Sequence, residues 1–170
     1  SHKAALANGG NEIAPPTDIP PGRFSVVTTP SGAAMCLFHE ADENMAAHHP
    51  GGTGSVHWVE LHSQDIDKDL EWLKGTFGYD VQDSPIPNGT YHLLKVGDEQ
   101  RAGAMKAMMD GVPSAWVAWF EVDDCDAAMK RVEGNGGKAL SPAMDMDGVG
   151  RMAMVMDNQG AAFGIIAPAR

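Results

Sequence analysis

The feature that most constrains the fold of this chain is an internal repeat. Residues 1–40 repeat, in order, the stretch from about Arg131 to Pro168. The offset is 127 residues in the first part and 128 in the second, so one inserted residue near Asp147-Gly148 accounts for the difference. The chain is therefore interpreted as one whole module preceded by the tail of another. The matched positions are Asn8-Gly9-Gly10 with Asn135-Gly136-Gly137, Pro15 with Pro142, Gly22-Arg23 with Gly150-Arg151, Val27 with Val155, and Gly32-Ala33-Ala34 with Gly160-Ala161-Ala162.

This repeat predicts three segments. Residues 1–40 are the remnant of a first module and supply the end of a helix and three strands. Residues 41–54 have no periodicity and combine Ala, His, Pro and Gly, which is typical of a linker. Residues 55–168 form the complete module.

The complete module divides into two similar halves. Alternation predicts a strand at residues 56–63, and apolar residues at helical spacing predict a helix that Asp65 caps. A strand at 116–122, a helix at 123–137 and further strands near 138–142, 151–156 and 161–166 complete the second half. Three residues recur 61 positions later, so each half is predicted to be β-α-β-β-β: Trp58, Glu60 and Asp65 match Trp119, Glu121 and Asp126.

Composition excludes several classes of protein. The 170 residues are 43% hydrophobic, which is enough for a buried core. A net charge of −11 argues against nucleic-acid binding, which needs clustered Lys and Arg. No apolar run reaches the roughly 20 residues of a membrane span, and no signal peptide opens the chain, so a cytoplasmic location is expected. The two cysteines, Cys36 and Cys125, are predicted to be reduced.

The order of these motifs resembles the vicinal oxygen chelate superfamily, which includes glyoxalase I, bleomycin-resistance proteins and extradiol dioxygenases. The resemblance rests on the paired halves, the WVEL start, the NGG turn after the helix and the closing GRMAMVMDNQGAAFGI. It is strongest to the two-module branch labelled glyoxalase-like or hydroxylase-like, with the first module truncated here. It implies an α+β fold in which paired β-α-β-β-β motifs form a curved mixed sheet around a cleft.

The resemblance also implies where a metal ion would bind. Metal-using members carry His or Glu on the first strand of a module, on the strand that opens its second half and on the last strand. The corresponding residues here are Trp58, Val117 or Trp119, and Gly164, and the remnant has Cys36 at the closing position. None of Trp, Val or Gly binds a divalent cation through its side chain, so no metal is expected at the family's usual position.

A small-molecule site is expected instead. Methionine is flexible and polarizable, and with Trp58 and Trp119 it suits an apolar cleft for a flat ligand, although core filling accounts for most of the methionines. Arg151 matches Arg23 across the repeat and is either half of a structural salt bridge or an anchor for an anionic group. The predicted ligand-binding residues are Trp58, Trp119, Val117, Met105, Met154, Gly164 and Arg151.

Acid–base catalysis is the alternative hypothesis. Strand alternation puts Glu60 and His62 on the face of Trp58, and the symmetry-related strand adds Glu121. The predicted catalytic residues are therefore Glu60, Glu121 and His62, acting alone or around a displaced divalent metal with His92. The competing interpretation is that the glutamates only hold strand ends or helix ends by hydrogen bonds.

Three functions follow, in order of preference. The first is a glyoxalase/bleomycin-resistance-like protein that binds a small apolar or aromatic molecule without the usual metal. The second is a lyase, isomerase or oxygenase of the same superfamily that uses Glu60, Glu121 or His62, and the third is a scaffold that works through protein contacts. Because three strands leave an exposed edge, residues 1–40 are predicted to pack on another module, in the same chain or in a homodimer.

Overall fold

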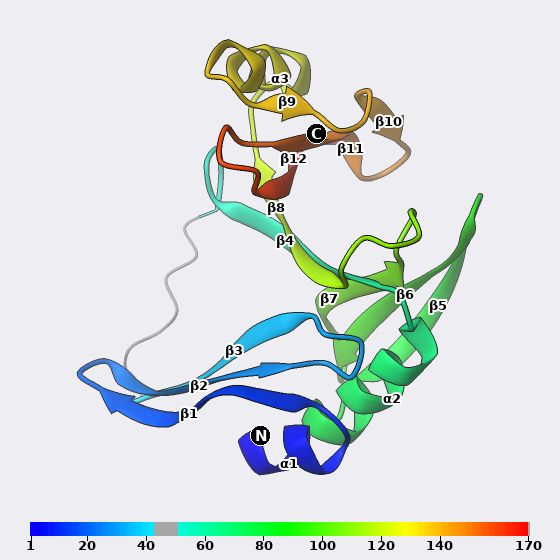
Figure 1. Ribbon diagram of the computed structural model, residues 1–170. Helices are drawn as coiled ribbons and strands as arrows, with labels where there is room; N and C mark the ends of the chain where they lie inside the picture. The colour runs from blue at the N-terminus through cyan, green and yellow to red at the C-terminus, as the bar shows by residue number, and fades with distance from the viewer. Residues whose placement is uncertain (43–50, 170) are drawn as a thin grey trace. The chain divides into compact units, whose positions relative to one another are not determined.

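The computed structural model describes residues 1–42 and 51–169. The chain forms two compact units (Figure 1): unit 1 is Ser1–Ala47 with Glu60–Trp116, and unit 2 is His48–Val59 with Val117–Arg170. Of the predicted linker at 41–54, residues 43–50 lie outside the described residues. The predicted boundaries at residues 40 and 55 were placed by the internal repeat. The two units are defined instead by contacts within each unit, so they do not test these boundaries, which stay predictions.

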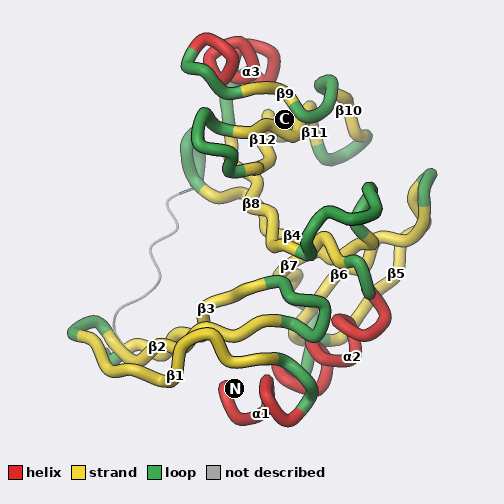
Figure 2. Tube along the Cα trace, in the orientation of Figure 1, coloured by secondary structure: helices red, strands yellow, loops and turns green. Residues whose placement is uncertain are grey.

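The repeated remnant forms the first part of unit 1. It contains α1 (His2–Ala7) and a three-stranded antiparallel sheet in the order β1-β2-β3. Figure 2 draws this helix in red and these strands in yellow. The helix end and three strands match the elements expected from the sequence. The strand bounds are β1 (Asn11–Ile19), β2 (Gly22–Thr28) and β3 (Ala34–Glu40).

The first half of the module supplies the rest of unit 1. Strand β4 (Val56–Ser63) has the predicted bounds and runs from unit 2 into unit 1. Its residues 60–63 pair in parallel with β7, and the order continues antiparallel as β7-β6-β5. The elements after β4 are α2 (Ile66–Phe77), β5 (Asp80–Ile86), β6 (Gly89–Val96) and β7 (Glu99–Lys106).

Helix α2 follows the predicted apolar spacing but not the predicted cap. Its side chains Leu70, Trp72 and Leu73 are buried, and it ends at Gly78, which has the left-handed φ of +71° that glycine adopts readily. Asp65 occupies the cap position, yet its side chain makes no cap hydrogen bond. Asp65 therefore stands at the predicted cap position but lacks the predicted side-chain bond, and its own N–H donates to Ser63 Oγ at 3.0 Å.

Contacts inside unit 1 join the remnant to the half-module. The buried Trp72 donates from Nε1 to the carbonyl oxygen of Ala5 at 2.8 Å. The fully buried carboxylate of Asp69 accepts from Ser31 N at 3.0 Å and from Ser63 Oγ at 2.7 Å, and Ser31 Oγ also donates to it. The partner of residues 1–40 in this structure is thus the β4–β7 half of the same chain.

Unit 2 holds the second half of the module. Strand β8 lies parallel to β12, which pairs antiparallel with β11, and β11 in turn pairs with β9 and β10. Of the predicted strand near 138–142, only residues 138–139 form a strand, β9, and β10 is a further short strand that was not expected. The bounds are β8 (Ala115–Glu121), α3 (Cys125–Gly134), β9 (Lys138–Ala139), β10 (Met144–Met146), β11 (Gly150–Met156) and β12 (Ala162–Pro168).

The N-terminal cap of α3 differs from its predicted position. Asp124 caps the helix by accepting a hydrogen bond from the N–H of Ala127 at 3.0 Å. Asp126, which was matched with Asp65 as the acidic cap, lies in the first turn and binds Arg151. The 61-residue repeat therefore places an acidic residue near both helix starts, but the local backbone decides which one caps.

The two cysteines are free, Cys36 exposed and Cys125 buried, as expected for reduced thiols. Burial, followed by the nearby Asp126 carboxylate, raises the pKa of the Cys125 thiol. Within the residues that the structure describes, no helix is long and apolar enough to cross a membrane.

Candidate functional site

An apolar cluster in unit 2 gathers most of the predicted ligand-binding residues. Val117, Trp119 and Ile166 are buried there, and Trp58, Met152 and Met154 pack against them half-buried. The cluster forms because β8, β12 and β11 are neighbours: Trp119 pairs with Gly164, and Gly164 pairs with Met154. Val117 lies two residues before Trp119 and so shares its face of the strand.

The indole ring of Trp119 packs directly against the backbone of Gly164. A Cβ added at Gly164 would come 2.1 Å from Trp119 Cε3 and 2.2 Å from Cδ2, far inside van der Waals contact. The indole is only 6% exposed, and its Nε1 is buried with no hydrogen-bond partner among the described residues. The absence of a side chain at Gly164 is thus what allows Trp119 to occupy this position.

These residues do not fit the metal ion of the superfamily. The positions that the resemblance assigns to ligands hold Trp58, Val117 or Trp119, and Gly164, and they assemble into the apolar cluster. An indole N–H is only a donor, and neither valine nor glycine offers a side-chain lone pair. In ranges 1–42 and 51–169, no group of three or more His, Cys, Asp or Glu side chains is arranged to hold a metal ion.

A polar cluster in unit 1 surrounds the carboxylate of Glu60. His62 Nε2 lies 2.8 Å from Glu60 Oε1, and the Tyr91 hydroxyl donates to Glu60 Oε2 at 3.0 Å. Glu60 is 6% exposed, whereas His62 and Tyr91 are half-buried. A buried carboxylate with two donors is held in one orientation, which is the arrangement of an acid–base group or of its positioning partner.

Sheet pairing explains this polar cluster and shows what the sequence missed. His62 and Tyr91 both lie opposite Met105 on β7, so the three side chains form one row across β4, β7 and β6. Met105, a predicted ligand-binding residue, is buried in the middle of this row. Tyr91 was not predicted, because only the strand order β4-β7-β6 brings it to Glu60.

His92 is not part of the polar cluster. Successive residues of a strand point to opposite faces, so His92 lies on the face away from Tyr91. Its Nδ1 is 2.7 Å from Asp83 Oδ1 on the neighbouring strand β5. The structure therefore does not assemble the displaced metal site that combined His92 with Glu60 and His62.

Glu121 belongs to unit 2 and has a partner of its own. Its Oε2 lies 3.4 Å from Nδ1 of the exposed His57, and its backbone N–H donates to Ser55 at 3.0 Å. The predicted trio of Glu60, His62 and Glu121 is therefore divided between the two units. Neither glutamate side chain bonds a helix terminus in the interactions seen here.

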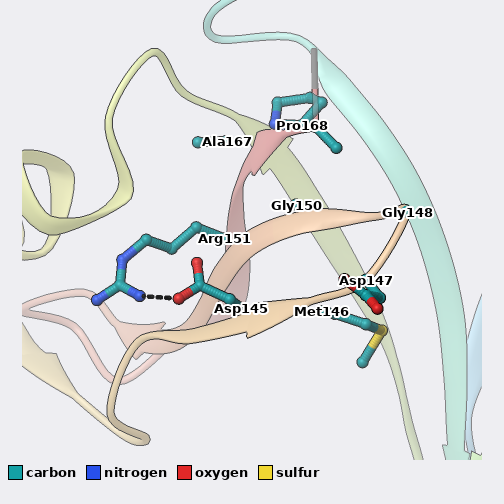
Figure 3. Close-up of a pocket in the computed structure, with 9 residues that line it drawn as sticks. Asp145, Met146, Asp147, Gly148, Gly150, Arg151, Ala167 and Pro168 are labelled. Atoms are coloured by element: carbon teal, nitrogen blue, oxygen red, sulfur yellow. Dashed lines mark hydrogen bonds and ion pairs between the residues drawn. The ribbon is translucent and has the colours of Figure 1, made fainter.

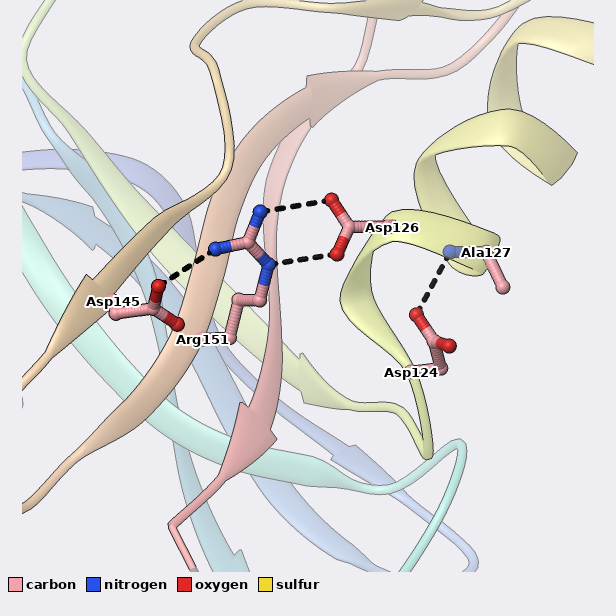
Figure 4. A network of polar contacts seen from close by, with 5 residues as sticks. All are labelled: Asp124, Asp126, Ala127, Asp145 and Arg151. Atoms are coloured by element: carbon pink, nitrogen blue, oxygen red, sulfur yellow. Dashed lines mark hydrogen bonds and ion pairs between the residues drawn. The ribbon is translucent and has the colours of Figure 1, made fainter.

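Arg151 makes a structural salt bridge (Figure 4). Its Nε and Nη2 donate to the two oxygens of Asp126 at 2.7 and 2.9 Å, and Nη1 donates to Asp145 at 2.8 Å. Hydrogen bonding to Arg151 lowers the pKa of Asp126, and the two carboxylates raise the pKa of Arg151. These contacts account for Arg151 without a ligand, and its role as an anion anchor remains a prediction.

A shallow hollow of about 600 Å³ lies beside this salt bridge in unit 2 (Figure 3). Arg151 is the one predicted ligand-binding residue in its lining, and the Trp119 cluster does not border it. The hollow faces solvent and lacks aromatic side chains, so the apolar cluster is the better candidate for an apolar ligand. Its lining residues are Asp145, Met146, Asp147, Gly148, Gly150, Arg151, Ala167, Pro168 and Ala169.

Comparison with known proteins places the chain. No protein-family model matches it. It is 36% identical over 166 residues to CFP32 of Mycobacterium tuberculosis, which is named as a glyoxylase; the match covers 96% of this chain but 63% of the relative. It is also 31% identical over 127 residues to the anthracycline biosynthesis protein DnrV of Streptomyces peucetius, covering 66% of this chain and 46% of the relative. The chain thus spans less than two thirds of the length of these relatives.

Solved structures agree on the fold. The Mn(II)-bound glyoxalase from Novosphingobium aromaticivorans matches 98% of this chain and 57% of its own, with a TM-score of 0.64 and 14% identity. The 2,3-dioxygenase LapB from Pseudomonas sp. KL28 matches 98% of this chain and 65% of its own, with a TM-score of 0.59 and 13% identity. The predicted glyoxalase/bleomycin-resistance fold is confirmed, and these relatives and structures support the predicted vicinal oxygen chelate superfamily.

Proposed function

We propose that this protein binds a small, flat, apolar or aromatic molecule on the apolar cluster of unit 2, with no metal at the superfamily's usual position. The observation that carries the proposal is the packing of Trp119 on Gly164, since two positions assigned to metal ligands are used there for an aromatic platform. The name of one relative supports the ligand class, because anthracyclines are flat polycyclic aromatic compounds.

The cluster has suitable chemistry for such a ligand. Trp119 is buried, whereas Trp58, Met152 and Met154 are half-buried and keep part of their surface accessible. An indole face stacks on flat ring systems, and methionine side chains adjust to irregular apolar shapes. The ligand is proposed to lie against Trp58, Met152 and Met154, which pack on the buried Trp119.

A calorimetric titration tests this function. With anthraquinone-2-sulfonate as the probe, Trp58→Ala is expected to weaken binding on the order of tenfold or more, because stacking on an aromatic side chain contributes about 1–3 kcal/mol. The matched control is Val149→Ala, which removes an exposed apolar side chain of the same unit outside the cluster. Affinity should be unchanged by EDTA.

Two results would contradict the binding proposal. One is equal affinity in the wild type and Trp58→Ala; the other is affinity that vanishes with EDTA and returns with a divalent cation. Native mass spectrometry of the purified protein adds an independent check, since an ion retained in every subunit would also oppose a metal-free site.

The polar cluster of unit 1 favours a second candidate, an enzyme of the lyase, isomerase or oxygenase type. Glu60, buried and held by His62 and Tyr91, is the proposed acid–base group or the positioning partner of His62. Glu121 remains a candidate through its pair with His57, at the longer separation of 3.4 Å.

For this enzyme function, Glu60→Gln is expected to abolish turnover of a bound compound while binding persists. Glutamine keeps the shape but cannot take a proton, and general acid–base catalysis contributes about 10²–10⁴-fold in rate. Asp83→Asn is the control, because Asp83 bonds His92 on the other face of the sheet. Full activity in a folded Glu60→Gln protein would exclude this role, and circular dichroism would show that the variant is folded.

The setting of the protein completes the proposal. We also propose a cytoplasmic location, in line with the acidic composition, and a homodimer, because β1 and β3 each pair only with β2 among the described residues.

A further inference from the structure

The indole N–H of Trp119 is a polar group inside the apolar cluster of unit 2. Trp119 is only 6% exposed, and its Nε1 is buried with no hydrogen-bond partner among the described residues. An indole N–H can only donate, and nearly all buried donors in folded proteins have an acceptor. The Nε1 of Trp119 is thus available to an acceptor that a ligand brings.

The contact with Gly164 involves the other part of the indole. A Cβ added at Gly164 would lie nearest to Cε3, Cδ2 and Cζ3 of Trp119, at 2.1, 2.2 and 2.7 Å. These three atoms belong to the six-membered ring, whereas Nε1 belongs to the five-membered ring. The backbone of Gly164 therefore packs mainly against the six-membered ring, and a ligand can approach the N–H from elsewhere.

The side chains around Trp119 offer the N–H no strong acceptor. The apolar cluster contains hydrocarbon, indole and thioether groups, and the sulfur of methionine is a weak acceptor. Met152 and Met154 pack against the buried residues of the cluster and are half-buried. Methionine side chains are flexible, so a flat ligand can displace them and bring an oxygen atom to the N–H.

We propose that the ligand of the apolar cluster carries a ring carbonyl, and that this oxygen accepts a hydrogen bond from Nε1 of Trp119. The inference rests on the proposed binding function and adds the ligand class, which is quinones rather than plain aromatic hydrocarbons. A ring carbonyl lies in the plane of a flat molecule and is uncharged. It therefore supplies a strong acceptor without the cost of moving a charge into apolar surroundings.

Two probes that differ in the ring carbonyls test the inference by calorimetry. Anthraquinone-2-sulfonate and anthracene-2-sulfonate have the same three fused rings and the same sulfonate, but only the first has ring carbonyls. The ratio of their affinities is expected to shift about five- to tenfold against the quinone in Trp119→Phe, because phenylalanine keeps an aromatic ring and lacks the N–H. Effects of the smaller ring on packing act on both probes and largely cancel in the ratio.

Trp116→Phe is the matched control. The Nε1 of Trp116 is also buried without a partner among the described residues, but Trp116 does not belong to the apolar cluster. It lies three residues before Trp119 on β8, so its side chain points to the opposite face of the strand. The affinity ratio should stay at its wild-type value in Trp116→Phe, and an equal shift in both variants would overturn the assignment to Trp119.

The outcomes separate this inference from the binding function. Trp58→Ala should weaken both probes to a similar extent. If it does so while Trp119→Phe leaves the ratio unchanged, the quinone inference is overturned and the binding function stands. If the wild type binds neither probe, both are overturned.

A measurement on the wild-type protein does not depend on the folding of Trp119→Phe. The chain has four tryptophans, and labelling them with ¹⁵N gives one indole N–H signal for each. Once the signals are assigned, the proton of Trp119 is expected to move downfield with anthraquinone-2-sulfonate and not with anthracene-2-sulfonate, because a hydrogen bond deshields it. Equal shifts with the two bound probes would overturn the inference.

Discussion

Replacing Asp69 with alanine is expected to lower the free energy of unfolding by about 3–5 kcal/mol, the larger of the two main effects predicted from this structure. The carboxylate is fully buried and accepts hydrogen bonds from Ser31 N, Ser31 Oγ and Ser63 Oγ. Removing it leaves these donors without an acceptor in a place that water does not reach. Because Ser31 belongs to the remnant and Ser63 to β4, the loss falls on the packing inside unit 1.

Urea denaturation at pH 7 measures this effect. Asp67→Ala is the matched control: Asp67 is in the same first turn of α2 but exposed, so its loss should cost less than about 1 kcal/mol. A double-mutant cycle of Asp69→Ala with Ser31→Ala should show strong coupling between the two side chains. A value for Asp69→Ala within 1 kcal/mol of the control would mean that Asp69 does not link the remnant to the half-module.

Gly164→Ala is expected to destabilise the protein by about 1–3 kcal/mol, although it adds one methyl group. The new Cβ would lie 2.1 Å from Trp119 Cε3, so the indole or the strands must move. The substitution is therefore expected to disturb the platform to which we assign ligand binding. Thermal unfolding with calorimetry measures the loss.

Two variants separate this clash from a general effect of glycine. Gly134→Ala, at the end of α3, meets no atom within 4 Å and should be neutral or slightly stabilising. In a Trp119→Ala background, which is itself less stable, Gly164→Ala should cost almost nothing further, since the atoms with which it collides are gone. An equal cost in both backgrounds would show that Trp119 does not depend on the missing side chain.

The two proposed functions rest on different units of the chain. Binding is assigned to the apolar cluster of unit 2, and acid–base chemistry to Glu60, His62 and Tyr91 of unit 1. The experiments on Trp58 and Glu60 therefore have independent outcomes. If Trp58→Ala lowers ligand affinity and Glu60→Gln changes neither affinity nor turnover, the protein is a binding protein. If Glu60→Gln abolishes turnover and Trp58→Ala leaves affinity unchanged, it is an enzyme.

The repeat and the periodicity of apolar residues predicted most of the architecture. The strand at 56–63, the helix after Asp65 and the β-α-β-β-β order of the first half follow from local spacing, and the structure has them in these places, whereas the second half contains the additional short strand β10. The sequence did not predict correctly which acidic residue caps a helix where several acidic residues lie close together. Asp65, Asp124 and Asp126 all stand near helix starts, and only the backbone conformation and the position of Arg151 decide that Asp124 caps while Asp126 forms an ion pair.

Sequence alone predicted the superfamily and the fold, and the internal repeat is a property of the sequence itself, since these depend on residue identity and order. The replacement of the family's metal ligands by Trp58, Val117 or Trp119, and Gly164 stays a prediction. Tertiary structure decided which side chains meet. Tyr91 reaches Glu60 because β6 and β4 flank β7, and Trp119 rests on Gly164 because β8 runs parallel to β12. Strand order arises from contacts between distant parts of the chain, so the spacing of residues along one strand does not say which side chains it meets on its neighbours.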